Sequence, residues 1–306
     1  QRATSQASVT TAGYYTVDRM QWIADYGTVT LSQDTDVPSG YGFANSFKAD
    51  VTTAGTVVSA GYVLLRQKIE GQNLQYLKKG TSSAQSLTLS FWIKSTKTGT
   101  YIAELYDADN TRQISKSYTV SASNTWEKKT ITFAGDTTGA FGNDNAASLF
   151  VNLYLSAGSD YTSGTLNTSW AASTNANRVV GQVDAQDNTS NNIYFTGIQL
   201  EAGDTASEFE FLPYDINLAR CQRYYFKTLA SQWLYAINST NANSRSEVVF
   251  KCTMRDTPTA GSVAFSNSGT ATGTQNANKN HVTVYVNGIG AADTSLNSGA
   301  TFAAEL

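Results

Sequence analysis

The chain has 306 residues, enough for two β-domains of ordinary size or for one large domain with an appendage. Only 15% of its residues are charged, and its net charge of −3 comes without a basic cluster, which argues against tight binding of nucleic acid. No apolar run reaches the roughly 18 residues that a membrane-spanning helix needs, which argues against membrane insertion.

Apolar and polar residues alternate along most of the chain up to residue 201, a pattern that predicts half-buried antiparallel strands. Stretches rich in Gly, Asp, Asn and Ser separate the alternating segments, as expected for turns. A helical turn is predicted over 71–80. The predicted strands are 14–23, 27–33, 43–51, 61–69, 86–94, 99–107, 114–121, 126–134, 148–156 and 193–201.

The stretch EFEFLPYDINLARCQRYYF, residues 208–226, interrupts this pattern. Pro213 ends the preceding strand, and Asp215 is placed to act as the N-cap of a helix of about three turns. The run SNSGTATGTQNANKN, residues 266–280, is predicted to be a flexible hairpin loop or an exposed tip. Further alternating segments predict strands at 233–238, 247–255, 262–266 and 281–288.

These elements predict an all-β fold with three parts. An antiparallel jelly-roll sandwich occupies residues 1–212, a short linking helix occupies 213–227, and a small C-terminal β-sandwich domain occupies 228–306. The last part is small for an independent core, so we expect it to dock on the first part or on its own copies.

Residue types that carry catalysis are sparse, and no catalytic residue is predicted. The single histidine, His281, begins a predicted strand, and nothing around it indicates an activated nucleophile. Paired carboxylates would be sufficient for glycoside hydrolysis, but surface carboxylates are the simpler interpretation. The available acidic residues are Glu104, Asp107, Asp109, Glu127, Glu201, Glu208 and Glu210.

No cofactor or metal is predicted. The loops at 33–36, 107–110 and 184–192 are rich in oxygen ligands, but none has the spacing of an EF-hand, so a structural calcium ion is not supported and ordinary turns are favoured. Cys221 and Cys252 are interpreted as buried free thiols, with the helix carrying the first and an apolar strand face the second. A disulfide between them is left open.

Several aromatic residues are predicted to point away from the main core face of their strands. They suit a sugar-binding platform, because aromatic rings stack on the C–H faces of sugars while amide groups bond the hydroxyls. Burial against a subunit or a covering loop is the alternative. The glycan-binding candidates are Trp92, Tyr106, Phe150, Asn152 and Tyr154.

Eight sequence blocks together resemble a carbohydrate-binding-module-like jelly-roll family of virion structural and tail-fibre proteins of tailed bacteriophages. The resemblance covers about residues 1–226. The blocks are QRATS (1–5), YYTVDRMQW (14–22), SQDTDVPSGYGFANSFKADV (32–51), LLRQKIEGQNLQYL (64–77), SLTLSFWIKSTKTGTY (86–101), NTWEKKTITFAGDTTG (124–139), IYFTGIQLEAGDTASEFEFLPY (193–214) and LARCQRYYF (218–226).

The resemblance implies a non-enzymatic, trimeric component on the exterior of the virion. It assigns no residue as a sugar contact and no catalytic residue. In members of the family the QR…DR opening follows a short strand of the INGAM type, which leaves open whether an attachment segment precedes Gln1. We expect Arg220, Arg223, Tyr224 and Tyr225 to form docking surface between domains or protomers.

The leading hypothesis is a tail-fibre or surface-spike protein that adsorbs to host-cell glycans through many weak contacts in a homotrimer. The alternative is a purely architectural capsid decoration, head fibre or tail adaptor, whose partners are other virion proteins. A glycan depolymerase ranks last.

Overall fold

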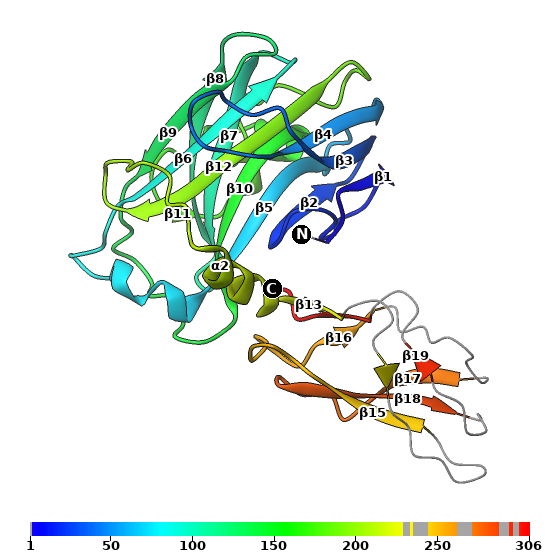
Figure 1. Cartoon of the computed structure of the whole chain (residues 1–306). Helices are drawn as coiled ribbons and strands as arrows, with labels where there is room; N and C mark the ends of the chain where they lie inside the picture. Colours follow the sequence, from blue (N-terminus) through cyan, green and yellow to red (C-terminus); the bar gives the residue numbers. More distant parts are fainter. Residues whose placement is uncertain (1, 229–232, 235–243, 262–270, 288–293, 296–299) are drawn as a thin grey trace. The chain divides into compact units, whose positions relative to one another are not determined.

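The structure is a computed structural model that describes residues 2–228, 233–234, 244–261, 271–287, 294–295 and 300–306. The chain divides into two compact units (Figure 1). Unit 1 comprises residues 1–210 together with Leu306, and unit 2 comprises residues 211–305.

Unit 1 is a sandwich of two six-stranded antiparallel sheets, which we call sheet A and sheet B. Sheet A has the order β1-β3-β4-β12-β6-β9, and sheet B has the order β11-β8-β7-β10-β5-β2. The predicted antiparallel jelly-roll sandwich is therefore confirmed. The strands of sheet A are Ser5–Val9 (β1), Thr28–Asp34 (β3), Ser46–Thr53 (β4), Leu87–Ser95 (β6), Glu127–Phe133 (β9) and Asn192–Ala202 (β12).

Sheet B supplies the other layer of the sandwich. Its strands are Met20–Ala24 (β2), Tyr62–Glu70 (β5), Gly99–Asp107 (β7), Arg112–Val120 (β8), Ala147–Ala157 (β10) and Ala171–Ala172 (β11). Between them lie the 3₁₀ turns Gly71–Asn73 (η1), Gln75–Leu77 (η2) and Asn175–Asn177 (η3), and the short helix Ser159–Thr162 (α1).

The core lies between the two sheets and follows the predicted alternation. On β6, Leu89 and Phe91 are fully buried in this core, while Trp92 lies on the opposite face. On β10, Leu149 and Leu153 are buried in the same core. Because side chains alternate with period two, these inward positions determine which residues the outer faces carry.

Some local predictions for unit 1 differ from the structure. The strand predicted at 14–23 begins only at Met20, and β1 was not predicted. The burial pattern of β1 explains the miss, since Val9 is its only buried residue. The predicted helical turn at 71–80 is present as the two consecutive 3₁₀ turns η1 and η2.

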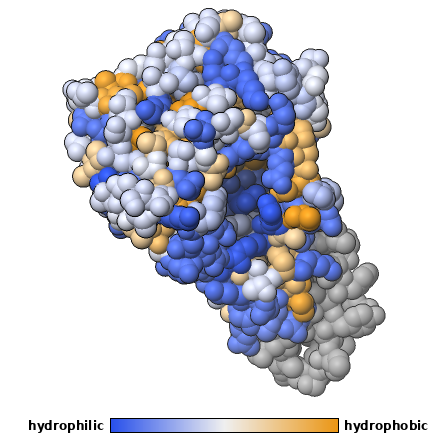
Figure 2. All heavy atoms as spheres, turned by 90° about the vertical axis from the view of Figure 1, so that its left-hand side faces the viewer, coloured by the Kyte–Doolittle hydropathy of each residue, from blue (hydrophilic) through white to orange (hydrophobic). Residues whose placement is uncertain are grey.

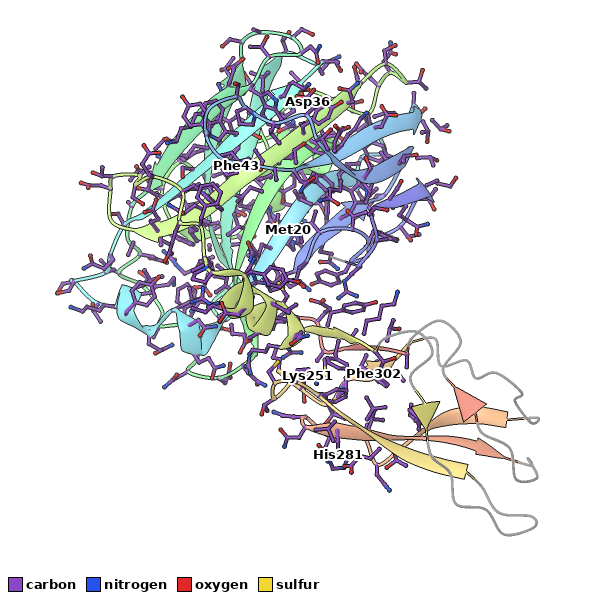
Figure 3. All side chains as sticks on the ribbon, in the orientation of Figure 1. Met20, Asp36, Phe43, Lys251, His281 and Phe302 are labelled. Atoms are coloured by element: carbon purple, nitrogen blue, oxygen red, sulfur yellow. The ribbon has the colours of Figure 1, made fainter. Side chains whose placement is uncertain are left out.

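Unit 2 contains short antiparallel sheets with a core of its own. Phe226, Phe250 and Phe302 pack together at ring-centroid distances of 5.4 Å, and Figure 3 labels Phe302. The strands are Tyr225–Lys227 (β13), Trp233–Leu234 (β14), Ser244–Val249 (β15), Thr259–Ala260 (β16), Ala271–Gln275 (β17), His281–Asn287 (β18), Thr294–Ser295 (β19) and Thr301–Ala303 (β20).

Two predictions for unit 2 were wrong in part. The strand predicted at 247–255 ends at Val249, so Cys252 is not on a strand face, and its side chain is half-buried rather than buried. The loop predicted at 266–280 contains β17. The strand predicted at 262–266 lies outside the described residues. Of the strand predicted at 233–238, only residues 233–234 are described.

Helix α2, Tyr214–Gln222, begins immediately after Pro213. Pro213 occupies the N-cap position, so the prediction of Asp215 as N-cap was wrong. Asp215 lies in the first turn, where its negative charge still complements the helix dipole. Every residue from Tyr214 to Arg220 is exposed.

Apolar residues occur in small groups separated by hydrophilic residues on the face shown in Figure 2. Scattered apolar residues of this kind are normal for a protein surface. Among the described residues, no helix is long and apolar enough to cross a membrane.

Candidate functional site

The outer face of sheet B, which points away from the sandwich core, carries four of the five glycan-binding candidates. Its side chains form rows across β8, β7, β10 and β5, because these strands pair in register. One row is Gln113, Tyr106, Phe150 and Lys68, and the next is Ser115, Glu104, Asn152 and Arg66.

Glu104 is the centre of the second row and is completely buried. Arg178 donates to both of its carboxylate oxygens at 2.8 Å, Asn152 donates to it at 2.7 Å, and Tyr154 donates at 3.1 Å. Arg66 Nε in turn donates to Asn152 Oδ1 at 2.7 Å. This network joins three strands to the segment that carries Arg178, and so holds the outer face rigid.

Asn152 and Tyr154 are themselves completely buried. The side chain of Tyr154 packs with Ile102, Leu64 and Val179 in a small apolar cluster on this side of the sheet. The prediction that Asn152 and Tyr154 contact sugar directly was therefore wrong. Their buried side chains support the surface from beneath. Burial raises the pKa of Tyr154 well above its usual value, with Glu104 adding to the effect, so the hydroxyl stays protonated and donates.

Partly exposed side chains above this network form a surface in which two adjacent rings lie between two arginines. Tyr106 and Phe150 lie 5.6 Å apart between ring centroids. Arg66 Cζ lies 5.0 Å from the centroid of Phe150, and Arg178 Cζ lies 5.1 Å from that of Tyr106. We call Arg66, Phe150, Tyr106 and Arg178 the arginine–aromatic surface.

Arg178 and Arg66 both carry a positive charge, but only the charge of Arg178 is paired with a carboxylate. Arg178 forms a bidentate ion pair with Glu104. Burial alone would lower the pKa of Arg178, but the paired carboxylate of Glu104 raises it, so the guanidinium remains charged. Arg66, in contrast, has no carboxylate oxygen within 4.0 Å of its side-chain nitrogens in the described part of the chain.

Trp92 does not belong to this surface, because it lies on the outer face of sheet A. It contacts Tyr41, with ring centroids 4.4 Å apart and Tyr41 47% exposed. The five candidates therefore do not form one site. The sequence predicted that these aromatic candidates point away from the core, but it did not predict which strands share a sheet.

The loop that carries Tyr41 is held to sheet A by Asp36. The Asp36 carboxylate accepts hydrogen bonds from Lys94 and from Trp126 Nε1, the latter at 2.8 Å. The hydrogen bond from Lys94 lowers the pKa of Asp36, so the loop is pinned by a charged pair at neutral pH. Figure 3 labels Asp36 and Phe43, which belong to this same loop.

The oxygen-rich loops behave as turns. Asp107 Oδ1 accepts main-chain hydrogen bonds from Asp109 and Asn110 at 3.0 Å, as turn-forming aspartates do. Lys79 Nζ lies 2.5 Å from Asp107 Oδ2 and 3.1 Å from Asp136 Oδ2, so a lysine supplies the compensating charge. No group of three or more His, Cys, Asp or Glu side chains within the described ranges could hold a metal ion.

The other predicted residues lie in unit 2. Arg220 is exposed, Arg223 and Tyr225 are half-buried, and Tyr224 is buried. Their docking role stays a prediction. His281 Nδ1 lies 3.2 Å from Glu247 Oε1 across β15 and β18. Cys221 and Cys252 are not joined by a disulfide, and Cys221, like Cys252, is half-buried rather than buried as predicted.

Sequence reasoning missed Arg66, Arg178 and Tyr41. Arg66 occupies an outward position of a predicted strand, so its alternation phase could have indicated this face. Arg178 and Tyr41 lie on loops, where no periodicity places a side chain.

No protein-family model matches the chain, and no curated protein sequence is significantly similar to it. Some solved structures are similar. The enzymatically active domain of tailspike protein 4 of bacteriophage CBA120 is 16% identical, with 59% of this chain and 19% of that chain covered at a TM-score of 0.33.

A CBM4 carbohydrate-binding module is 11% identical, with 60% and 86% of the two chains covered at a TM-score of 0.31. A putative sugar binding protein from Bacteroides thetaiotaomicron is 12% identical, with 64% and 100% covered at a TM-score of 0.32. Likenesses at these scores support no inference about ligand or assembly. Our inferences about both rest on the residues of the chain.

Proposed function

We propose that the chain is a non-enzymatic structural protein on the exterior of a bacteriophage virion, of the tail-fibre or surface-spike type, and that unit 1 binds host-surface glycans. The observation that carries the glycan-binding part is the arginine–aromatic surface, with two adjacent half-exposed rings above a locked polar network. The virion part rests on the resemblance of the sequence blocks.

The surface suits a saccharide for two physical reasons. Aromatic rings take up the apolar C–H faces of sugars, and neighbouring donors bond their hydroxyls. The buried carboxylate of Glu104 fixes Arg178 and Asn152 before any ligand arrives, which limits the entropy lost on binding. Individual contacts would be weak, and a homotrimer would present three copies and gain avidity.

The test is binding of the purified full chain to an array of bacterial surface polysaccharides. We expect Phe150→Ala and Tyr106→Ala to weaken binding about tenfold, because each removes a stacking ring. Tyr41→Ala is the matched control: it removes an exposed ring from the loop that contacts Trp92 of sheet A and should leave binding unchanged.

Melting curves of all three variants show whether folding is preserved. Loss of binding in the Tyr41 variant but not in the Phe150 variant would move the site to sheet A. Absence of binding to every polysaccharide would reject glycan binding, and release of reducing sugar would show that the protein is an enzyme.

The architectural alternative is favoured by a separate observation in unit 2. Apolar side chains are exposed on and just before α2, with Tyr214 at 80%, Phe211 at 57% and Ile216 at 45%. Exposed apolar side chains of this kind suit packing against another copy of the chain or another virion protein.

Light scattering of the wild type and of Ile216→Lys tests this alternative. A trimer that the substitution dissociates, in a protein that binds no glycan, would support the architectural role. Antibody labelling of particles under the electron microscope would test the proposed location on the virion exterior.

A further inference from the structure

We infer that the saccharide taken by the arginine–aromatic surface is acidic, and that Arg66 is the residue that pairs with its carboxylate. The inference rests on the proposed glycan-binding function of that surface and specifies the ligand's chemical class. It follows from how charge is distributed among the side chains of the outer face of sheet B.

Arg66 carries a charge that no described carboxylate pairs with, whereas Lys68, whose Nζ lies 5.6 Å from the Phe150 centroid, donates to Leu306 O at 2.6 Å. Arg178 turns one edge of its guanidinium to Glu104, with Nε and Nη2 each 2.8 Å from a carboxylate oxygen, so its charge is paired. Arg66 uses Nε alone, on the neutral amide oxygen of Asn152. Since no described carboxylate lies within 4.0 Å of Arg66, an anion brought by a ligand would be its first charged partner.

Arg66 is also held in position for such a partner. Its Nε is anchored at 2.7 Å and its guanidinium lies 5.0 Å from the Phe150 ring centroid, so the side chain is fixed at two points. The half-exposed side chain thus offers its terminal nitrogens with little loss of rotamer freedom. A planar guanidinium matches a planar carboxylate with two parallel hydrogen bonds.

The rings favour the same conclusion. A guanidinium lies about 5 Å from the centre of each, so neither ring offers a face remote from positive charge. A neutral sugar could stack only beside these cations. A sugar with a carboxylate could stack beside the ring and neutralise Arg66 in the same pose. The chain as a whole has a net charge of −3, so the cationic character of this face is local.

The experiment compares matched saccharides that differ only in charge. The full chain is titrated with array polysaccharides that contain uronic acids and with the same polymers after reduction of their carboxylates to alcohols. Polygalacturonate and its carboxyl-reduced form serve as the solution probe. We expect the acidic forms to bind at least about tenfold more tightly, and added salt to weaken them selectively.

Variants connect this preference to Arg66. We expect Arg66→Gln to weaken the acidic ligand about tenfold and to leave the reduced ligand unchanged, and Arg66→Lys to recover only part of the loss. Lys128→Gln removes an exposed positive charge from sheet A and should change neither. Melting curves check that the Arg66 variants remain folded.

The two proposals fail in different ways. Equal affinity for acidic and reduced forms, lost in Phe150→Ala but not in Arg66→Gln, would overturn the acidic ligand and leave glycan binding intact. If Arg66→Gln and Lys128→Gln weakened binding of the acidic ligand equally, the preference would reflect the overall charge of the protein. That result would also overturn the inference. Binding to neither form would reject the glycan function itself, and the inference with it.

Discussion

Glu104 shows how a single buried residue shapes a surface that it does not reach. Its carboxylate is completely buried and accepts hydrogen bonds from three side chains, which come from β10 and from the segment around Arg178. A charge in this position is stable only because Arg178 pairs with it. The half-exposed rings of Tyr106 and Phe150 above it depend on this arrangement for their spacing.

We therefore expect Glu104→Gln to lower the free energy of unfolding by about 3–5 kcal/mol, because it leaves the half-buried Arg178 without its counter-charge. Urea denaturation followed by circular dichroism measures the change. Glu208→Gln is the control, since that carboxylate is exposed, and should stay within about 0.5 kcal/mol of the wild type. Equal stability of the two variants would show that the ion pair contributes nothing net.

The lowered pKa of Asp136 indicates that the free energy of unfolding depends on this carboxylate at low pH. Burial alone would raise its pKa, but hydrogen bonds from Arg112, at 2.7 and 3.0 Å, and from Lys79 lower it. A carboxyl whose pKa is lower in the folded state stabilises the protein above its unfolded pKa of about 3.9 and loses this effect as pH falls through the folded value.

We expect the free energy of unfolding to decrease on acidification below about pH 4, and Asp136→Asn to be less stable at pH 7 with a shallower dependence on pH. Urea titrations between pH 2 and pH 7 give both curves. An unchanged acid slope in the variant would mean that other carboxylates dominate, with Asp36 and Asp187 as the next candidates because lysines lower their pKa values.

At the scale of elements, the loops rather than the strands decide what the outer faces expose. The segment from Gly158 onward folds over part of sheet B, and its Leu166 and Val179 help to cover Tyr154. The segment begins where the main chain passes very close to a neighbouring turn. A Cβ atom on Gly158 would lie 2.0 Å from the carbonyl oxygen of Val58 and 2.4 Å from that of Ser59.

Gly158→Ala is expected to destabilise unit 1 by about 1–3 kcal/mol, because two main-chain segments must separate to admit the methyl group. Gly142→Ala is the control: its nearest neighbour would be 3.4 Å away, which is ordinary contact. Differential scanning calorimetry of both variants decides the matter. A variant at Gly158 as stable as that at Gly142 would show that the turn moves freely.

Element prediction succeeded where side chains alternate and failed where they do not. The strands β6, β7 and β10 were predicted with their correct inward faces, since half-buried strands carry a period of two. β1 has one buried residue and β17 lies in a run of small polar residues, so neither shows an apolar alternation. Both are held by pairing with a neighbouring strand.

For the whole molecule, the two units have separate cores. The core of unit 1 draws on residues between Val9 and Phe195, and that of unit 2 on residues between Phe226 and Ala304. Neither core shares a residue with the other. A unit with its own core is able to fold alone.

We expect a fragment of residues 1–212 to unfold cooperatively and to bind the same glycans as the full chain. Calorimetry and array binding of the fragment, beside those of the full chain, provide the measurement. The full chain measured under the same conditions is the reference for both. An insoluble fragment, or one with a broad transition, would show that unit 1 depends on the rest of the chain.

The sequence alone determined the fold class and the inward faces of β6, β7 and β10, because alternation and turn residues are local properties of the chain. It also indicated that Tyr106 and Phe150 lie on an outer face. The tertiary structure decided that Trp92 lies on the other sheet, that Asn152 and Tyr154 are buried, and that Arg66 and Arg178 flank the rings. Strand order and loop paths depend on contacts between residues far apart in the sequence, and no local pattern records those contacts.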